Sequence, residues 1–128
     1  MNARWRAAVI HGRGRGRRIG FPTLNFKIPE HFPYAHGIYA GFVMIGDRKI
    51  PAAIHFGPIP TFGENEPTLE AHLIDEKINS APREIEIEFI RRIREIRTFA
   101  TSEALAAQIA RDVEDVRRVL AKAASTQT

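Results

Sequence analysis

The chain has 128 residues, of which 44% are apolar, and a formal net charge of +4. This length and composition predict one globular domain spanning residues 1–128 and exclude an intrinsically disordered chain. Cysteine is absent, which excludes disulfides, thiolate metal sites and cysteine nucleophiles. No apolar run approaches the roughly 20 residues needed to span a bilayer, so we expect a cytoplasmic protein with no membrane partner.

Positive charge is concentrated at the start of the chain. Residues 1–18 hold six arginines and no acid, and the first acidic residue is Glu30. This concentration predicts an anionic partner, either a nucleic acid or the phosphate chain of a nucleotide. Composition alone does not choose between the two.

Short apolar runs between prolines and glycines predict β-strands in the first two-thirds of the chain. A Gly/Arg loop at 11–20 follows the first of them. Gly46-Asp47 predicts the turn of a hairpin, and Pro51, near the start of its second strand, would suit a strand start or a sheet edge. The predicted strands cover residues 5–10, 38–45, 49–56, 68–74 and 84–90.

The last two predicted strands alternate between polar and apolar residues, as half-buried strands do. In the first of them, Thr68, Glu70, His72 and Ile74 share one face, opposite Leu69, Ala71 and Leu73. In the second, Glu84, Glu86 and Glu88 are expected outside, with Ile85, Ile87 and Phe89 inside.

The apolar spacing changes after residue 101. One stripe of an α-helix is formed by Leu105, Ile109, Val113, Val116 and Leu120. The predicted helix covers about 102–123, with Thr101 or Ser102 as its N-cap and a frayed tail at 124–128. Several antiparallel strands followed by one long helix predict a mainly β protein, a small barrel covered by a C-terminal α-helix.

The Gly/Arg loop is the first candidate site. Glycines let the backbone approach a ligand and turn N–H groups toward an anion, and arginines donate two hydrogen bonds to a phosphate. Such runs also occur as solvated loops or nucleic-acid contacts. The candidate phosphate-binding residues in this loop are Gly12, Gly14, Arg15, Gly16 and Arg18.

Thr23 and Asn25 form the second candidate. They lie two positions apart, so in an extended segment both side chains face the same side. Hydroxyl and amide oxygens suit Mg²⁺, which usually takes one or two protein ligands and fills its remaining positions with water and phosphate oxygens. The alternative is a turn in which both side chains bond to local backbone.

Glu70 is the third candidate. A carboxylate within reach of a primary hydroxyl can take its proton during phosphoryl transfer. The alternative is an exposed strand face that carries a glutamate and His72. We expect His55 and His72 to be ordinary core or surface histidines, and their spacing does not favour a zinc site.

Together these segments resemble the riboflavin kinase (flavokinase) family, including the kinase domain of bacterial bifunctional FAD synthetases. The resemblance runs from about Trp5 to about Leu120. It is carried by Gly12-x-Gly-Arg-Gly-x-x-x-Gly-Phe-Pro-Thr-x-Asn25, Gly37-Ile-Tyr-Ala-Gly41, Gly57-Pro-x-Pro-Thr-Phe-Gly-Glu-Asn65, Thr68-Leu-Glu-Ala-His-Leu-Ile-Asp75 and Glu84-Ile-Glu-Ile-Glu-Phe89.

The resemblance implies a six-stranded antiparallel, Greek-key-like barrel with a C-terminal helix. It implies that the 12–20 loop covers the ATP phosphates, that Thr23 and Asn25 bind Mg²⁺ and the nucleotide, and that Glu70 activates the riboflavin hydroxyl. Arg94 matches an arginine that borders the flavin. Phe99 is a candidate for the flavin slot, because a large apolar ring needs aromatic or aliphatic neighbours.

The sequence departs from the family pattern mainly near the loops and the flavin side. Leu24 stands where alanine is usual, Ile59 where asparagine is usual, and Ile96 where a glutamate is usual. Glu76 replaces an aromatic residue, and Ser80-Ala81-Pro82 replaces Leu-Tyr-Gly. The departures put flavin affinity and specificity in doubt and leave the nucleotide side intact.

The leading prediction is therefore an Mg²⁺-dependent enzyme that converts ATP and riboflavin to ADP and FMN. A catalytically weak or inactive flavin- or nucleotide-binding module of the same fold is the second hypothesis. A nucleic-acid-binding barrel is the third and least favoured, because aromatic residues are not interleaved with the arginines. FAD synthesis would need an adenylyltransferase domain in a longer chain or a separate enzyme.

Overall fold

The computed structural model describes residues 3–12, 19–77 and 80–126. The elements are β1 (Ala3–Ile10), β2 (Leu24–Phe26), β3 (Gly37–Ile45), β4 (Arg48–Gly57), the 3₁₀ turn η1 (Pro60–Phe62), β5 (Thr68–Leu73), β6 (Glu84–Arg94) and α2 (Ser102–Thr126). Among these residues, no helix combines the length and the apolar character that crossing a membrane requires.

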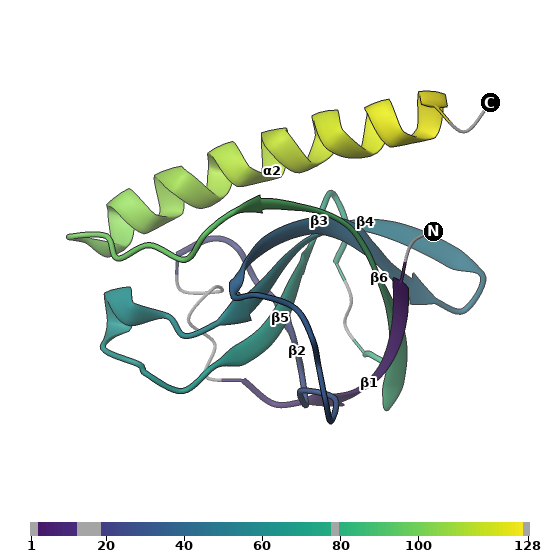
Figure 1. Ribbon diagram of the computed structural model, residues 1–128, viewed down its shortest axis with the longest axis horizontal. Coiled ribbons are helices and arrows are strands. Elements are labelled where there is room, and N and C mark those ends of the chain that lie inside the picture. Colours follow the sequence, from purple (N-terminus) through teal and green to yellow (C-terminus); the bar gives the residue numbers. More distant parts are fainter. Residues whose placement is uncertain (1–2, 13–18, 78–79, 127–128) are drawn as a thin grey trace.

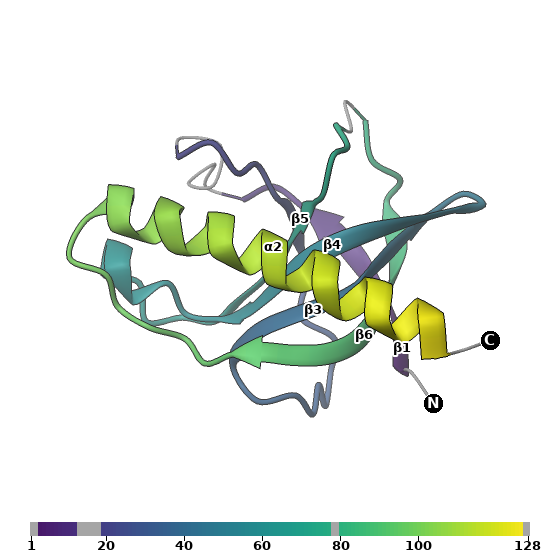
Figure 2. The same cartoon turned by 90° about the horizontal axis from the view of Figure 1, so that it is seen from above.

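The six strands form one closed antiparallel barrel in the order β1-β2-β5-β4-β3-β6. Helix α2 lies along the outside of the barrel (Figure 1) and, seen from above, crosses β3, β4 and β6 (Figure 2). The prediction of a mainly β, six-stranded antiparallel barrel with a C-terminal helix is confirmed. Closure gives each of the six strands a hydrogen-bonded neighbour on both sides.

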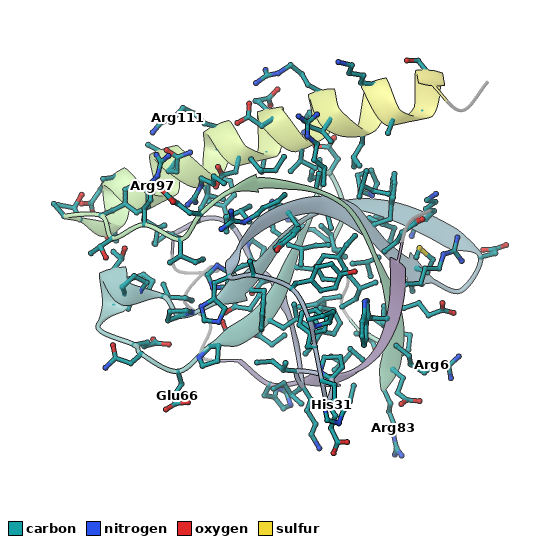
Figure 3. All side chains as sticks on the ribbon, in the orientation of Figure 1. Arg6, His31, Glu66, Arg83, Arg97 and Arg111 are labelled. Carbon is teal, nitrogen blue, oxygen red and sulfur yellow. The ribbon has the colours of Figure 1, made fainter. Side chains whose placement is uncertain are left out.

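The inside of the barrel is filled by side chains, as Figure 3 shows. The segment between β2 and β3 contributes Phe32 and Tyr34 to this core, and the Tyr34 ring stacks on Phe89 with 4.4 Å between centroids. The indole of Trp5 donates a hydrogen bond to the Tyr34 hydroxyl at 3.1 Å. Because the interior is packed, a ligand site of useful size has to lie outside the barrel wall.

A second apolar layer joins the outer barrel wall to α2. It contains Ala40 and Ala53 from the barrel and Val113, Val116 and Leu120 from the helix. The predicted stripe therefore faces the barrel. Thr101 caps the helix, since its hydroxyl accepts the backbone N–H of Ala104 at 3.0 Å.

Four details differ from the expectations. The three-residue strand β2 was not among the predicted strands, and α2 continues to Thr126 instead of fraying from 124. Pro51 lies inside β4, not at an edge. Its pairing partner is Phe42 of β3. On the other side, the pairing of β4 with β5 begins only at Ala52, and the Pro51 carbonyl accepts the N–H of Ile74 at 2.9 Å. Glu88 is on the polar face of β6 but is buried, with its carboxylate 3.3 Å from the Lys49 ammonium.

Candidate active site

The pairing of β2 with β5 brings the predicted metal pair next to the predicted base. Asn25 lies opposite Glu70 in this register. The Thr23 hydroxyl, just before β2, donates a hydrogen bond to Glu70 Oε1 at 2.9 Å. The Asn25 amide nitrogen is 3.5 Å from the same hydroxyl oxygen. Three side chains predicted from two separate motifs, Thr23 and Asn25 from one and Glu70 from the other, therefore converge at one place.

Gly12 lies against this group. A Cβ at this position would come within 2.3 Å of the Asn25 carboxamide, so a side chain there would displace Asn25. The other predicted phosphate-binding residues, Gly14, Arg15, Gly16 and Arg18, lie outside the described residues. Their role stays a prediction.

Glu70 is held at its second oxygen as well. The Thr68 hydroxyl donates to Glu70 Oε2 at 2.8 Å. Thr68, Glu70 and His72 are half-buried on the outer face of β5, while Leu69, Ala71 and Leu73 point into the barrel core. The predicted alternation of β5 is confirmed, and it places the carboxylate on the side that faces α2.

The two histidines both bond to backbone carbonyls. His55 Nε2 is 2.8 Å from the Gly57 carbonyl and His72 Nδ1 is 2.8 Å from the Pro22 carbonyl, so each of these nitrogens carries the proton. Burial lowers the pKa of His55, partly opposed by its bond to Gly57. His55 is therefore neutral at pH 7, and His72 ties the segment before Thr23 to β5.

An apolar cavity lies between the outer wall of the barrel and α2. Its walls include Thr23, Glu70 and His72, with His55 from β4. Much of its lining is aliphatic or aromatic, including Phe21, Ile38, Ile59, Ile96, Leu105 and Ile109. A large planar, apolar ring is the kind of ligand that such a slot suits.

A second, more polar cavity adjoins the first. It is lined by Gly12, Asn25 and Lys27 on one side and by the segment from Gly63 to Glu70 on the other. Glu70 and Ile59 line both cavities. In Figure 3, Arg97 from the first cavity and Glu66 from the second lie on the same side of the molecule. The Glu70 carboxylate thus lies where the two cavities meet.

Arg94 and Phe99, the predicted flavin-binding residues, both line the apolar cavity. The Arg94 guanidinium lies 5.8 Å from the Phe99 ring centroid. It donates to both carboxylate oxygens of Asp112 on α2, at 2.9 and 2.7 Å. Its charge is therefore neutralised within the protein, and its contact with a flavin stays a prediction.

The residues around Glu70 fit a magnesium ion bound with a nucleotide. The Thr23 hydroxyl and the Asn25 amide provide hard oxygen atoms, and the Asn25 carboxamide lies against Gly12 in the space that a Cβ would fill. A site with two neutral protein ligands needs further oxygens from water and phosphate, as Mg²⁺ sites at nucleotides commonly have.

Several residues of the site were not predicted. Thr68 could have been predicted from the sequence, because it lies two positions from Glu70 and therefore on the same face of the strand. Asp112 falls within the helical stripe between Ile109 and Val116, where an acid indicates a buried partner. Thr61, which accepts the backbone N–H of Phe99 at 3.0 Å, carries no signal of its own.

Nearly the whole chain is similar to known proteins. Residues 1–120 match the family model described as flavokinase, riboflavin kinase. The bifunctional riboflavin kinase/FMN adenylyltransferase of Escherichia coli (strain K12) is 36% identical over 105 residues, which are 81% of this chain and 34% of that protein. The RNA-binding riboflavin kinase RibR of Bacillus subtilis (strain 168) is 32% identical over 111 residues, 86% of this chain and 48% of that protein.

Among solved structures, a riboflavin kinase from Trypanosoma brucei has the same fold, with a TM-score of 0.65 and 23% identity over 93% of this chain and 80% of that one. The chain belongs to the flavokinase family, the riboflavin kinases. It spans about a third of the length of the Escherichia coli relative.

Proposed function

We propose that this domain transfers the terminal phosphoryl group of ATP to the ribityl hydroxyl of riboflavin and produces ADP and FMN. The position of Glu70 supports this most strongly, because this residue lines both the apolar and the polar cavity and its carboxylate bonds to Thr23, beside Asn25. With the flavin ring in the first cavity and the triphosphate in the second, the hydroxyl and the reacting phosphate would meet at this carboxylate.

In this proposal Glu70 is the general base. It accepts the proton of the ribityl hydroxyl as that oxygen forms a bond to phosphorus and the bond to the ADP oxygen breaks. The base needs to be within hydrogen-bond reach of the hydroxyl, and two protein hydroxyls hold its carboxylate. Positioning supplies much of the rate in phosphoryl transfer, where the protein does little covalent chemistry.

Thr23 and Asn25 would hold Mg²⁺, which neutralises charge on the phosphates when it is bound. Thr23 can bind a cation through an oxygen lone pair while its O–H still donates a hydrogen bond to Glu70 Oε1. Asn25 would use its carboxamide oxygen, so its amide would turn from the arrangement in which its nitrogen faces Thr23. The 12–20 loop would cover the phosphates.

On the flavin side, Arg94 and Phe99 would border the ring in the apolar cavity. The aliphatic residues Ile59 and Ile96 line the same cavity, at two of the positions where this chain departs from the family pattern. Affinity for riboflavin is therefore a property to be measured separately from turnover.

The test is an incubation of purified protein with riboflavin, ATP and Mg²⁺, followed by chromatographic separation of the flavins. We expect FMN to form, and to stop forming when EDTA removes the metal. Riboflavin binding without turnover would favour the second hypothesis, a binding module that has lost catalysis.

RNA binding is a further candidate function, since the name of the Bacillus subtilis relative includes it. We expect no sequence-independent RNA binding here. The measurement is RNA affinity over a series of salt concentrations, because binding through arginines and phosphates weakens steeply as salt rises.

A further inference from the structure

We propose that Thr68 is a positioning residue, which fixes the orientation of the Glu70 carboxylate for catalysis. The inference deepens the proposed function and rests on it, because it assigns Thr68 a role only through the base. Thr68 lines the polar cavity but not the apolar one. Any effect of Thr68 on the flavin hydroxyl would therefore be transmitted by Glu70, which lines both cavities.

Two hydroxyl groups donate hydrogen bonds to the Glu70 carboxylate. Thr23 donates to Oε1 at 2.9 Å and Thr68 donates to Oε2 at 2.8 Å. One donor at each oxygen fixes the plane of the carboxylate. Without one of them, the last torsion of a glutamate has a broad, roughly two-fold preference, and the carboxylate can turn.

The two donors differ in how the fold holds them. Thr23 precedes β2 and belongs to the segment that would also bind the metal. Thr68 lies two residues before Glu70 on β5, and the register of β5 with β4 holds both, with Thr68 opposite Gly57 and Glu70 opposite His55. Thr68 is therefore the donor whose position does not depend on a ligand.

The Thr68 hydroxyl proton has two possible acceptors. The hydroxyl has one proton and two acceptors nearby, Glu70 Oε2 at 2.8 Å and the Gly57 carbonyl at 3.4 Å. That carbonyl already accepts the Nε2–H of His55 at 2.8 Å. Gly57 has a φ of 136°, which favours glycine, and this backbone geometry sets its carbonyl between the two side chains. Thr68 is thus directed to the shorter, charge-assisted bond with Glu70.

The experiment measures steady-state FMN formation by Thr68→Val, Thr68→Ser and Thr98→Val, a control at an exposed threonine. We expect Thr68→Val to lower kcat about 10- to 100-fold, the scale of misplacing a catalytic group, while KM for ATP and riboflavin changes much less. Thr68→Ser keeps the hydroxyl and should restore most of the rate. Thr98→Val should match the unmodified protein.

A double-variant cycle separates positioning from a structural role. If Thr68 acts through Glu70, adding Thr68→Val to Glu70→Gln lowers the rate no further, because residues that act as a unit are not additive. Equal losses in both backgrounds, or a Thr68→Ser variant as slow as Thr68→Val, would overturn the inference. Thermal unfolding verifies that each variant is folded, and Thr68→Ala replaces Thr68→Val if the extra methyl disturbs the strand.

The same cycle separates this inference from the proposed function. An active Glu70→Gln variant would remove Glu70 from the role of base and contradict the proposed mechanism itself. A Glu70→Gln variant that is nearly inactive, beside a fully active Thr68→Val variant, would leave the proposed function standing and overturn only the role of Thr68.

Discussion

Thr23 is the residue at which the proposed metal site and the proposed base meet. Its hydroxyl donates to Glu70 at 2.9 Å and lies 3.5 Å from the Asn25 amide nitrogen. A hydroxyl has one proton and two lone pairs, so it can donate to a carboxylate and bind a cation at the same time. Removal of the Thr23 hydroxyl should therefore affect both the Glu70 carboxylate and the binding of the metal ion.

Thr23→Val keeps the side-chain shape and removes the oxygen. We expect kcat to fall about 100-fold or more, as it does when one preorganised polar group is lost from an active site. The Mg²⁺ concentration for half-maximal rate should rise. Rates over a Mg²⁺ series give both quantities, with Thr23→Ser as the control that keeps the hydroxyl. An unchanged Mg²⁺ dependence in Thr23→Val would remove Thr23 from the metal site.

His55 provides a prediction on pH and stability. Burial is the main cause that lowers its pKa; the Gly57 carbonyl and Glu70 oppose the shift, and Arg94 and His36 add to it. The ordinary pKa of histidine is about 6.5. As the pH falls below that value, the unfolded chain takes up a proton that the folded protein does not, and the free energy of unfolding decreases.

His55→Gln removes this titration and keeps an N–H donor that can reach Gly57. We expect the unmodified protein to lose more stability than His55→Gln between about pH 7 and pH 5, and the two curves to run parallel above pH 7. Urea unfolding at a series of pH values measures the difference. Parallel curves over the whole range would show that His55 does not contribute in this way.

At the scale of elements, α2 is attached to the barrel by a buried ion pair as well as by its apolar stripe. Arg94 at the end of β6 donates twice to Asp112, and the two side chains are 10% and 2% exposed. Gln108 donates to the same carboxylate at 3.0 Å. Both residues of the pair also line the apolar cavity, so the shape of this cavity depends on the position of α2.

Asp112→Leu leaves the Arg94 charge buried without its partner. We expect a loss of about 3–5 kcal/mol in the free energy of unfolding, because breaking a buried pair leaves an uncompensated charge. Arg94→Met combined with Asp112→Leu should recover much of this loss. Chemical denaturation is the measurement. If the single and double variants are equally stable, the ion pair does not attach the helix as described.

An exposed pair provides the matched control for that experiment. Arg117 on α2 donates two hydrogen bonds to Asp75, at 2.6 and 2.9 Å, and the pairing lowers the pKa of Asp75. Both groups face solvent, where water and salt screen the attraction. Arg117→Met should therefore change stability little compared with Asp112→Leu.

Sequence patterns predicted the elements that have a clear period. The alternation of β5 and the stripe of α2 each identify a buried face, and the structure confirms both. Strand β2 has three residues, which is too short for a period to show, and its partners are distant in sequence. Arg94 was predicted from the family resemblance, but its bond to Asp112 joins two elements whose contact no local pattern indicates.

At the scale of the whole molecule, barrel closure creates the candidate site. Thr23 and Glu70 are 47 residues apart in sequence and meet because β2 pairs with β5. Family motifs predicted these residue types and their roles, and hard-oxygen chemistry favoured a metal near Thr23 and Asn25. Motifs could not predict the second donor on Glu70 or the two cavities that meet there, since both depend on strand register and on the placement of α2.

The most direct test of the account compares FMN formation by the unmodified protein and by Glu70→Gln at saturating riboflavin and Mg²⁺-ATP. Glutamine keeps the size of the side chain and cannot take a proton. We expect the unmodified protein to form FMN, and Glu70→Gln to lower kcat by about 10² or more while it still binds riboflavin. Turnover by Glu70→Gln at the rate of the unmodified protein would contradict the central claim.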